Sequence, residues 1–163
     1  MKKNKLMISG AGLTLAFIAQ ILCTFLFYDA AASSTRINLG WGVMLISAIF
    51  GWLPIFTFRR KGKVEGRSYI HTTVLVDTSV YRIVRHPQYL AGILLNLALF
   101  LITMHWTVLV FGAIAAVITY LDTFEEEKKN LEKFGDEYQD YQKKVPRLNF
   151  VLGILRLIFK KRS

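Results

Sequence analysis

The sequence predicts an all-α integral membrane protein with about four transmembrane helices and cytoplasmic C-terminal helices. Hydrophobic residues make up 53% of the 163 residues, and they gather in long uncharged runs. Basic residues, which give a formal net charge of +10, lie beside these runs and not within them. Long apolar runs flanked by positive charge are typical of membrane helices, whereas a soluble domain distributes its apolar residues periodically.

Four apolar segments are predicted to span the membrane: residues 6–28, 37–58, 88–103 and 105–122. At 1.5 Å per residue, each of the first two can cross roughly 30 Å of hydrocarbon. The last two form one apolar stretch that is broken only around His105, which predicts a tight helical hairpin with His105 exposed in its turn. Three alanines at 30–32 resemble a signal-peptide cleavage site, but the run before them exceeds the usual length of about 7 to 15 residues, so we expect a retained helix.

The distribution of basic residues predicts the orientation. With four spans, 20 of the 21 Lys and Arg residues lie on one side of the membrane, and only Arg36 lies on the other. Positive charge accumulates on the cytoplasmic side of membrane proteins, so both termini are predicted to be cytoplasmic. Because the basic residues flank apolar runs, anionic lipid headgroups are the expected partners, and nucleic acid is not.

The C-terminal part is predicted to lie outside the membrane. A charged helix with one aromatic stripe runs from Phe124 to about Lys144, with a bend or break at Gly135 and an end before Pro146. Residues 148–163 form a basic amphipathic tail that is too short to span, so we expect it at the membrane surface. We treat residues 1–163 as a single membrane domain in which residues 1–58 form an N-terminal transmembrane hairpin.

Some kinds of site are disfavoured by the sequence. Cys23 is the only cysteine, and there is no His-x-x-His pair or cysteine cluster, so we expect no metal site. There is also no Gly-x-Gly-x-x-Gly before a predicted helix, which argues against a soluble dinucleotide-binding fold.

The densest polar cluster lies where the third span begins, and its members are Arg82, Arg85, His86, Pro87, Gln88 and Tyr89. Proline suits the first turn of a helix, where its missing N–H costs nothing. The free N–H groups and the positive dipole end of that helix, beside two arginines, favour binding of a carboxylate or phosphate. The alternative is an ordinary basic membrane flank, which would not need the added histidine, proline and tyrosine.

A second cluster, Asp122 followed by Glu125–Glu127, lies at the cytoplasmic end of the fourth span. These carboxylates could cap a helix, pair with Arg82 or Arg85, or bind a ligand that carries positive charge or hydroxyl groups. If the third and fourth spans form a hairpin, both polar clusters lie at its cytoplasmic mouth.

Both clusters resemble one known family. The run Tyr81-Arg82-Ile83-Val84-Arg85-His86-Pro87-Gln88-Tyr89, followed by Gly92, resembles the Arg-His-Pro-x-Tyr signature of the isoprenylcysteine carboxyl methyltransferase and phospholipid methyltransferase superfamily. Residues Glu126-Glu127, Leu131, Phe134-Gly135, Tyr138, Tyr141 and Val145-Pro146-Arg147 resemble its closing segment. The resemblance covers residues 72–147, the expected catalytic region. Many members have Gly-Pro where this chain has Ser79-Val80, and a proline often follows where this chain has Leu148-Asn149-Phe150.

The resemblance implies a helical membrane enzyme that uses S-adenosylmethionine in a cytoplasmic pocket closed by the C-terminal segment. Carried over residue by residue, it assigns the cofactor pocket to Arg85, His86, Pro87, Tyr89, Gly92, Glu126, Glu127 and Tyr138. It assigns substrate contacts to Tyr141 and Arg147, and catalysis to Arg85, Glu127 and Arg147. An amine or hydroxyl acceptor would need a general base, which either Glu126 or Glu127 could provide, and a carboxylate acceptor would not.

The predicted function is therefore methyl transfer from S-adenosylmethionine to a lipid-like or prenylated carboxylate, amine or hydroxyl. Two alternatives stay open: an NADPH-dependent membrane reductase of the related sterol reductase type, and a non-catalytic polybasic scaffold. The acceptor atom, the particular membrane and the oligomeric state do not follow from the residues.

Overall fold

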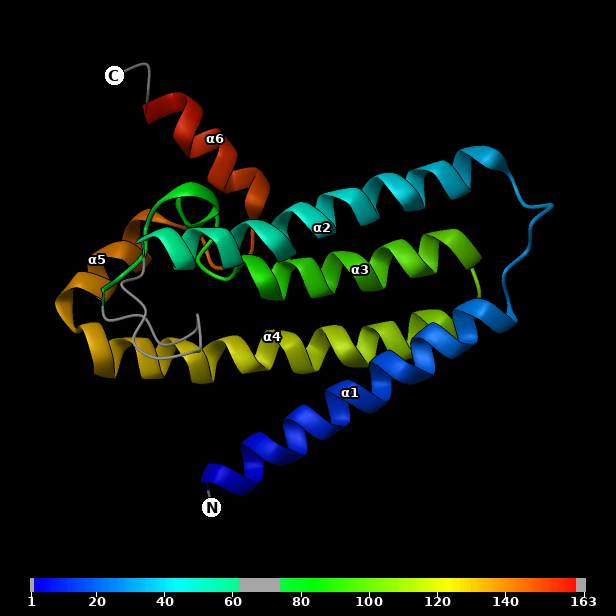
Figure 1. Ribbon diagram of the computed structural model, residues 1–163, viewed down its shortest axis with the longest axis horizontal. Coiled ribbons are helices and arrows are strands. Elements are labelled where there is room, and N and C mark those ends of the chain that lie inside the picture. The colour runs from blue at the N-terminus through cyan, green and yellow to red at the C-terminus, as the bar shows by residue number, and fades with distance from the viewer. Residues whose placement is uncertain (1, 62–73, 161–163) are drawn as a thin grey trace. The chain divides into compact units, whose positions relative to one another are not determined.

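A computed structural model describes residues 2–61 and 74–160, and every regular element in these ranges is helical. His71 and the first two residues of the predicted catalytic region, Thr72 and Thr73, lie outside the described residues. The elements are α1 (Lys2–Leu26), α2 (Ser34–Lys61), the short 3₁₀ helix η1 (Ser79–Arg82), α3 (Pro87–Thr103), α4 (Trp106–Phe134), α5 (Asp136–Lys144) and α6 (Phe150–Lys160) (Figure 1). The all-α class is confirmed.

Each of the four predicted spans corresponds to one helix, α1 to α4 in order. Spans 37–58 and 88–103 lie entirely within α2 and α3, whereas α1 ends two residues before position 28 and α4 begins one residue after position 105. Among the described residues, α2 and α4 are long and apolar enough to cross a membrane, and shorter apolar segments lie at Gly10–Leu26 and Pro87–Thr103. Helix α4 continues without a break from the apolar residues 105–122 into the charged residues that follow, so the predicted boundary after residue 122 is absent. Nothing between Asp122 and Phe124 disfavours helical backbone, and only the polarity of the side chains changes there.

Contacts divide the chain into two units that interleave along the sequence. The first unit comprises Met1–Ala48 and Ala91–Phe124, and the second comprises Ile49–Leu90 and Glu125–Ser163. Almost all predicted site residues belong to the second unit.

In the first unit, a buried glutamine connects α1 to the two later helices. The Gln20 side chain donates from Nε2 to the carbonyl oxygens of Asn96 (3.1 Å) and Val108 (3.3 Å). Gln20 is fully buried and Asn96 is 4% exposed. Gln20 Oε1 and both side-chain amide atoms of Asn96 have no hydrogen-bond partner among the described residues. Bonds between polar groups on different apolar helices fix the register of those helices.

The turn between α3 and α4 contains a strained backbone position. Met104 has φ = 51°, in the left-handed region that residues with a Cβ rarely adopt. His105, predicted to be exposed, is instead half-buried: its ring stacks on Phe27 at a centroid distance of 3.6 Å, and its Nδ1 lies 2.8 Å from Thr107 Oγ1. Stacking buries one face of the Phe27 ring and one face of the His105 ring, which an open turn would leave exposed.

Glycine at position 104 is expected to stabilise the protein. The Met104 side chain is 51% exposed, so little packing is lost, while glycine adopts positive φ without the steric cost of a Cβ. We expect Met104→Gly to raise the free energy of unfolding by about 1 kcal/mol, measured by thermal unfolding in detergent. Met104→Ala is the matched control, because it removes the side chain and keeps the Cβ. Equal melting temperatures for the two variants would contradict the strain argument.

In the second unit, two glycines are required by the backbone. Gly135 has φ = 54° and separates α4 from α5, which confirms the predicted break. Gly153 in α6 packs so closely on the loop before α3 that an added Cβ would lie 2.0 Å from the Ile83 carbonyl oxygen.

Ser79 also has positive φ (58°), at the position where many members of the resembled family have glycine. The departure from Gly-Pro therefore places a residue with a Cβ where glycine is favoured.

Candidate functional site

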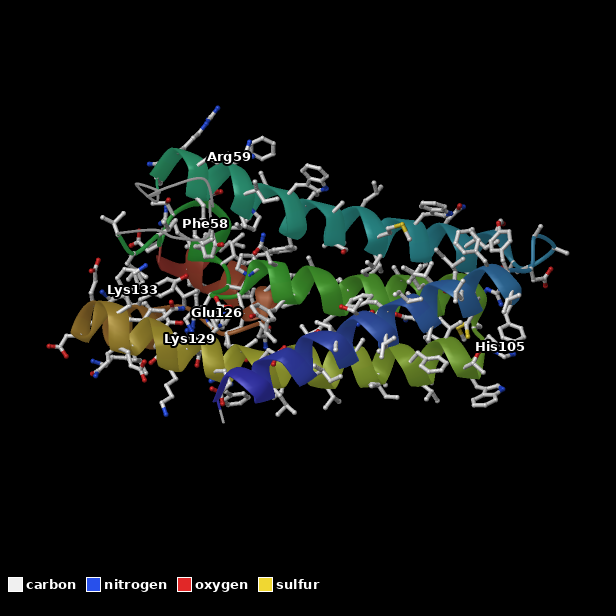
Figure 2. The ribbon with its side chains drawn as sticks, turned by 60° about the horizontal axis from the view of Figure 1, so that its bottom comes forward. Phe58, Arg59, His105, Glu126, Lys129 and Lys133 are labelled. Atoms are coloured by element: carbon white, nitrogen blue, oxygen red, sulfur yellow. The ribbon has the colours of Figure 1, made fainter. Side chains whose placement is uncertain are left out.

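The two predicted clusters meet within the second unit. Arg85 and His86 directly precede Pro87, the first residue of α3, which confirms proline at the start of that helix. Glu126 and Glu127 lie in the charged end of α4, and Arg147 follows α5. Figure 2 shows Glu126, Lys129 and Lys133 succeeding one another along this part of α4.

Glu127 is the centre of the cluster. Its Oε1 accepts hydrogen bonds from Arg85 Nε (3.0 Å) and Nη2 (2.6 Å), and from Arg147 Nε (3.1 Å). Its Oε2 accepts from Arg147 Nη2 at 2.5 Å, and His86 Nε2 lies 3.2 Å from Oε1. The Glu127 side chain is 7% exposed. A buried carboxylate that receives this many charged donors is held ionised, and its lone pairs are occupied by the protein itself.

Most donors of the Arg85 guanidinium also form hydrogen bonds within the protein. Besides its two bonds to Glu127, it donates from Nη1 to the carbonyl oxygens of Gln142 (2.8 Å) and Val145 (2.6 Å). Its backbone N–H donates to the Pro146 carbonyl at 3.0 Å, and that of His86 donates to the Arg147 carbonyl at 3.2 Å. Arg85 therefore holds the segment after α5 against the loop before α3.

A tyrosine makes a second connection between the same two segments. The Tyr141 hydroxyl donates to the Tyr81 carbonyl at 2.6 Å, and both rings are buried. Burial, together with the neighbouring Tyr138, raises the pKa of the Tyr141 hydroxyl above its ordinary value, so this group stays a proton donor. Tyr138 is 2% exposed, and its ring lies 5.8 Å from that of Tyr141.

His86 lies between the two glutamates and is 2% exposed. Its Nδ1 is 3.6 Å from Glu126 Oε1, beyond hydrogen-bond distance, and has no hydrogen-bond partner among the described residues. Burial by itself lowers the pKa of His86, but Glu126 and Glu127 outweigh this effect and raise the pKa above 6.5. The His86 and Tyr89 rings make an edge-to-face contact, with their centroids 5.6 Å apart.

The adjacent glutamates differ in exposure. The Glu126 side chain is 42% exposed, against 7% for Glu127. Glu126 is thus the carboxylate of the pair that a ligand can reach from solvent.

The remaining predicted site residues are placed less centrally. Pro87 is buried at the start of α3. Gly92 belongs to the first unit, where an added Cβ would lie 3.8 Å from Phe17 Cζ. The backbone carbonyls of Tyr81, Gln142 and Val145 also belong to the site, although they were not predicted from the sequence. A carbonyl has the same chemistry at every position, so no sequence signal identifies these acceptors.

The pairing of His86 predicts a pH-dependent stability. Because its folded-state pKa is raised, the stabilisation is fully present below about pH 6.5, the unfolded value, and is lost as pH rises through the folded pKa. The charged and titratable groups around His86 are Arg85, Tyr89, Glu126, Glu127 and Arg147. We expect the melting temperature of the native protein to fall as the pH is raised above about 6.5. His86→Gln, which keeps a donor and loses the titration, is expected to show a flatter profile, and identical profiles would contradict the assignment.

The fold and the site together define a class: a helical protein with membrane-type apolar helices and a buried Arg–His–Glu cluster beside a helix N-terminus. Residues 35–137 match the family described as phospholipid methyltransferase. The chain is also 33% identical over 123 residues to a methanethiol S-methyltransferase from Pseudomonas deceptionensis, an alignment that covers 71% of this chain and 44% of that protein. No solved structure matches the chain significantly.

The chain therefore belongs to the phospholipid methyltransferase family, as the two motifs predicted. With its two long apolar helices, this membership indicates a membrane protein. The chain spans less than half the length of the curated relative it matches.

Proposed function

We propose that the protein transfers a methyl group from S-adenosylmethionine to a lipid-like or small apolar acceptor at the cytoplasmic face of a membrane. The observation that carries this proposal is the convergence of Arg85, His86, Glu126, Glu127 and Arg147 in one unit of a chain that belongs to a methyltransferase family.

The residues fit the polar groups of S-adenosylmethionine. Its carboxylate suits the N-terminal end of α3, which begins at Pro87 and carries the positive end of the helix dipole. Its ammonium or ribose hydroxyls suit the half-exposed Glu126 carboxylate. His86 Nδ1, which is buried and lies just beyond hydrogen-bond distance of Glu126, offers a further polar group at the same place.

When bound, S-adenosylmethionine supplies an electrophilic methyl group on a sulfonium. The chain then has to align the acceptor and exclude water. Glu127 is a poor proton acceptor, because three cationic side chains already bind it. We therefore assign base catalysis to Glu126 for an amine, hydroxyl or thiol acceptor, whereas a carboxylate acceptor would need no base.

We propose two classes of acceptor. Lipid-like carboxylates, amines and hydroxyls suit a site beside apolar helices, as expected from the sequence. A small thiol is the second class, because the relative from Pseudomonas deceptionensis is named for methanethiol. Incubation with methyl-labelled S-adenosylmethionine and either membrane lipids or short alkanethiols separates them: label extracted with the lipids supports the first class, and label in volatile thioethers supports the second.

The same proposal includes the membrane arrangement. We propose that α1 to α4 all cross the bilayer and that both ends of the chain and the site face the cytoplasm. The support is the distribution of 20 of 21 basic residues on that side of a four-span arrangement.

The function is tested by ligand stabilisation of the full chain in detergent. S-adenosylhomocysteine at about a hundred times its dissociation constant should stabilise the protein by about 2.7 kcal/mol. NADPH is the matched control. A shift with NADPH alone would favour the reductase, and no shift with either ligand, in protein shown to be folded, would favour the scaffold.

A further inference from the structure

Helix α6 presents an almost continuous apolar surface to its surroundings. Six of its eleven positions hold large hydrophobic residues that are between 40% and 61% exposed: Val151, Leu152, Ile154, Leu155, Ile158 and Phe159. The helix contains no acidic residue, and basic residues follow one another at positions 160–162. An exposed apolar surface of this density on a short helix marks an interaction site.

The first turns of α6 are attached to the rest of the second unit. The Phe150 ring packs on Phe50 of α2 at a centroid distance of 5.9 Å. Gly153 lies against the Ile83 carbonyl, two residues before Arg85. Asn149 caps the helix, since its Oδ1 accepts the Leu152 N–H at 3.0 Å. Beyond this base, Arg156 of α6 donates from Nη1 to the Lys144 carbonyl oxygen at 3.4 Å.

The attachment point sets the depth of α6. Phe50 precedes Arg59, the first of the basic residues that end α2, by nine positions, which is about 13.5 Å along a helix. The ten steps from Phe150 to Lys160 extend about 15 Å. A helix that begins beside Phe50 and is this long can bring its C-terminal end close to the level of the basic end of α2 even when it is tilted.

We infer that α6 is inserted obliquely into the cytoplasmic leaflet of an anionic bilayer, with its apolar residues among the acyl chains and its C-terminal end near the headgroups. This differs from the surface position expected from the sequence, because the contact with Phe50 places the start of α6 below the headgroups. Anionic lipid is favoured by the uniform positive charge at its end. The inference rests on the proposed crossing of α2, and it does not depend on methyl transfer.

The test measures the depth of two positions along α6. In a Cys23→Ser background, single cysteines replace Ile154 or Phe159, each labelled with an environment-sensitive fluorophore. The protein is placed in nanodiscs of phosphatidylcholine and phosphatidylglycerol that contain a nitroxide either on the headgroup or near the middle of the acyl chain. We expect the ratio of mid-chain to headgroup quenching to be higher for position 154 than for position 159. A cysteine at Gln139, exposed on α5, is the control that neither nitroxide should quench.

Each other outcome would overturn the inference. Dominant headgroup quenching at both positions would place α6 flat on the surface. Accessibility of both labels to aqueous iodide would place it in water. Weak quenching with disulfide cross-linking between copies at position 159 would show that a second copy covers the apolar surface. A protein that fails to bind S-adenosylhomocysteine can still give the expected gradient, so this test and that of the proposed function fail independently.

Discussion

Replacing Glu127 with glutamine is expected to destabilise the protein by about 3–5 kcal/mol, the range for removing one partner of a buried ion pair. Glutamine keeps the shape of the side chain but leaves Arg85, Arg147 and protonated His86 without their shared negative charge. The side chains of Arg85 and His86 are 9% and 1% exposed, so water compensates little of this loss. Thermal unfolding of the full chain in detergent measures the effect.

The adjacent glutamate provides the matched comparison. Glu126 is half-exposed, so Glu126→Gln is expected to cost less than about 1 kcal/mol, as exposed ion pairs do. The same variant is expected to lose the stabilisation by S-adenosylhomocysteine. Glu132→Gln, on the exposed side of α4, should change neither property. Equal destabilisation by Glu126→Gln and Glu127→Gln would contradict the division of roles between the two carboxylates.

Replacing Arg85 with lysine is expected to have the second-largest effect, about 2–4 kcal/mol, although the charge is kept. A single ammonium cannot bind Glu127 and also reach the carbonyls of Gln142 and Val145. Each buried acceptor left without a donor costs about 1–3 kcal/mol. Arg82→Lys is the control, because Arg82 is exposed three residues earlier.

A local measurement separates this effect from general destabilisation. Arg85 holds the segment after α5, so in Arg85→Lys trypsin is expected to cleave faster after Lys143, which is 73% exposed. Cleavage there at the native rate, in a variant with a lowered melting temperature, would show that the segment is held by other contacts.

The helices were predictable because their signals are local. Apolar runs indicated α1 to α4, Pro87 marked the start of α3, and Gly135 marked the end of α4. The false boundary after residue 122 arose from reading a change in polarity as a change in backbone. Polarity reports the medium around a helix, whereas helical hydrogen bonds continue wherever the backbone permits them.

The site was predictable in its residues and not in their contacts. Two motifs identified Arg85, His86, Glu126 and Glu127 as neighbours, and the structure brings them together. Pairing of a glutamate with Arg85 was one of three alternatives that the sequence left open, and the structure shows this pairing for Glu127, whereas the two backbone carbonyls that Arg85 also reaches were not predicted. Which carbonyls lie within reach depends on the path of the chain after α5, and that path is set by packing and not by residue type.

The hydrogen bonds of Gln20 have a consequence for biogenesis. Helix α1 leaves the ribosome long before the backbone of Asn96 and Val108, its only acceptors among the described residues, has been synthesised. In the proposed arrangement α1 crosses the bilayer, where an amide without partners is costly, so α1 would gain its full stability only after α3 and α4 have been inserted. Until then, the growing chain presents an incompletely satisfied helix to the insertion machinery. A protein stalled before residue 96 should therefore remain associated with that machinery, and Gln20→Leu should release α1 into the lipid earlier.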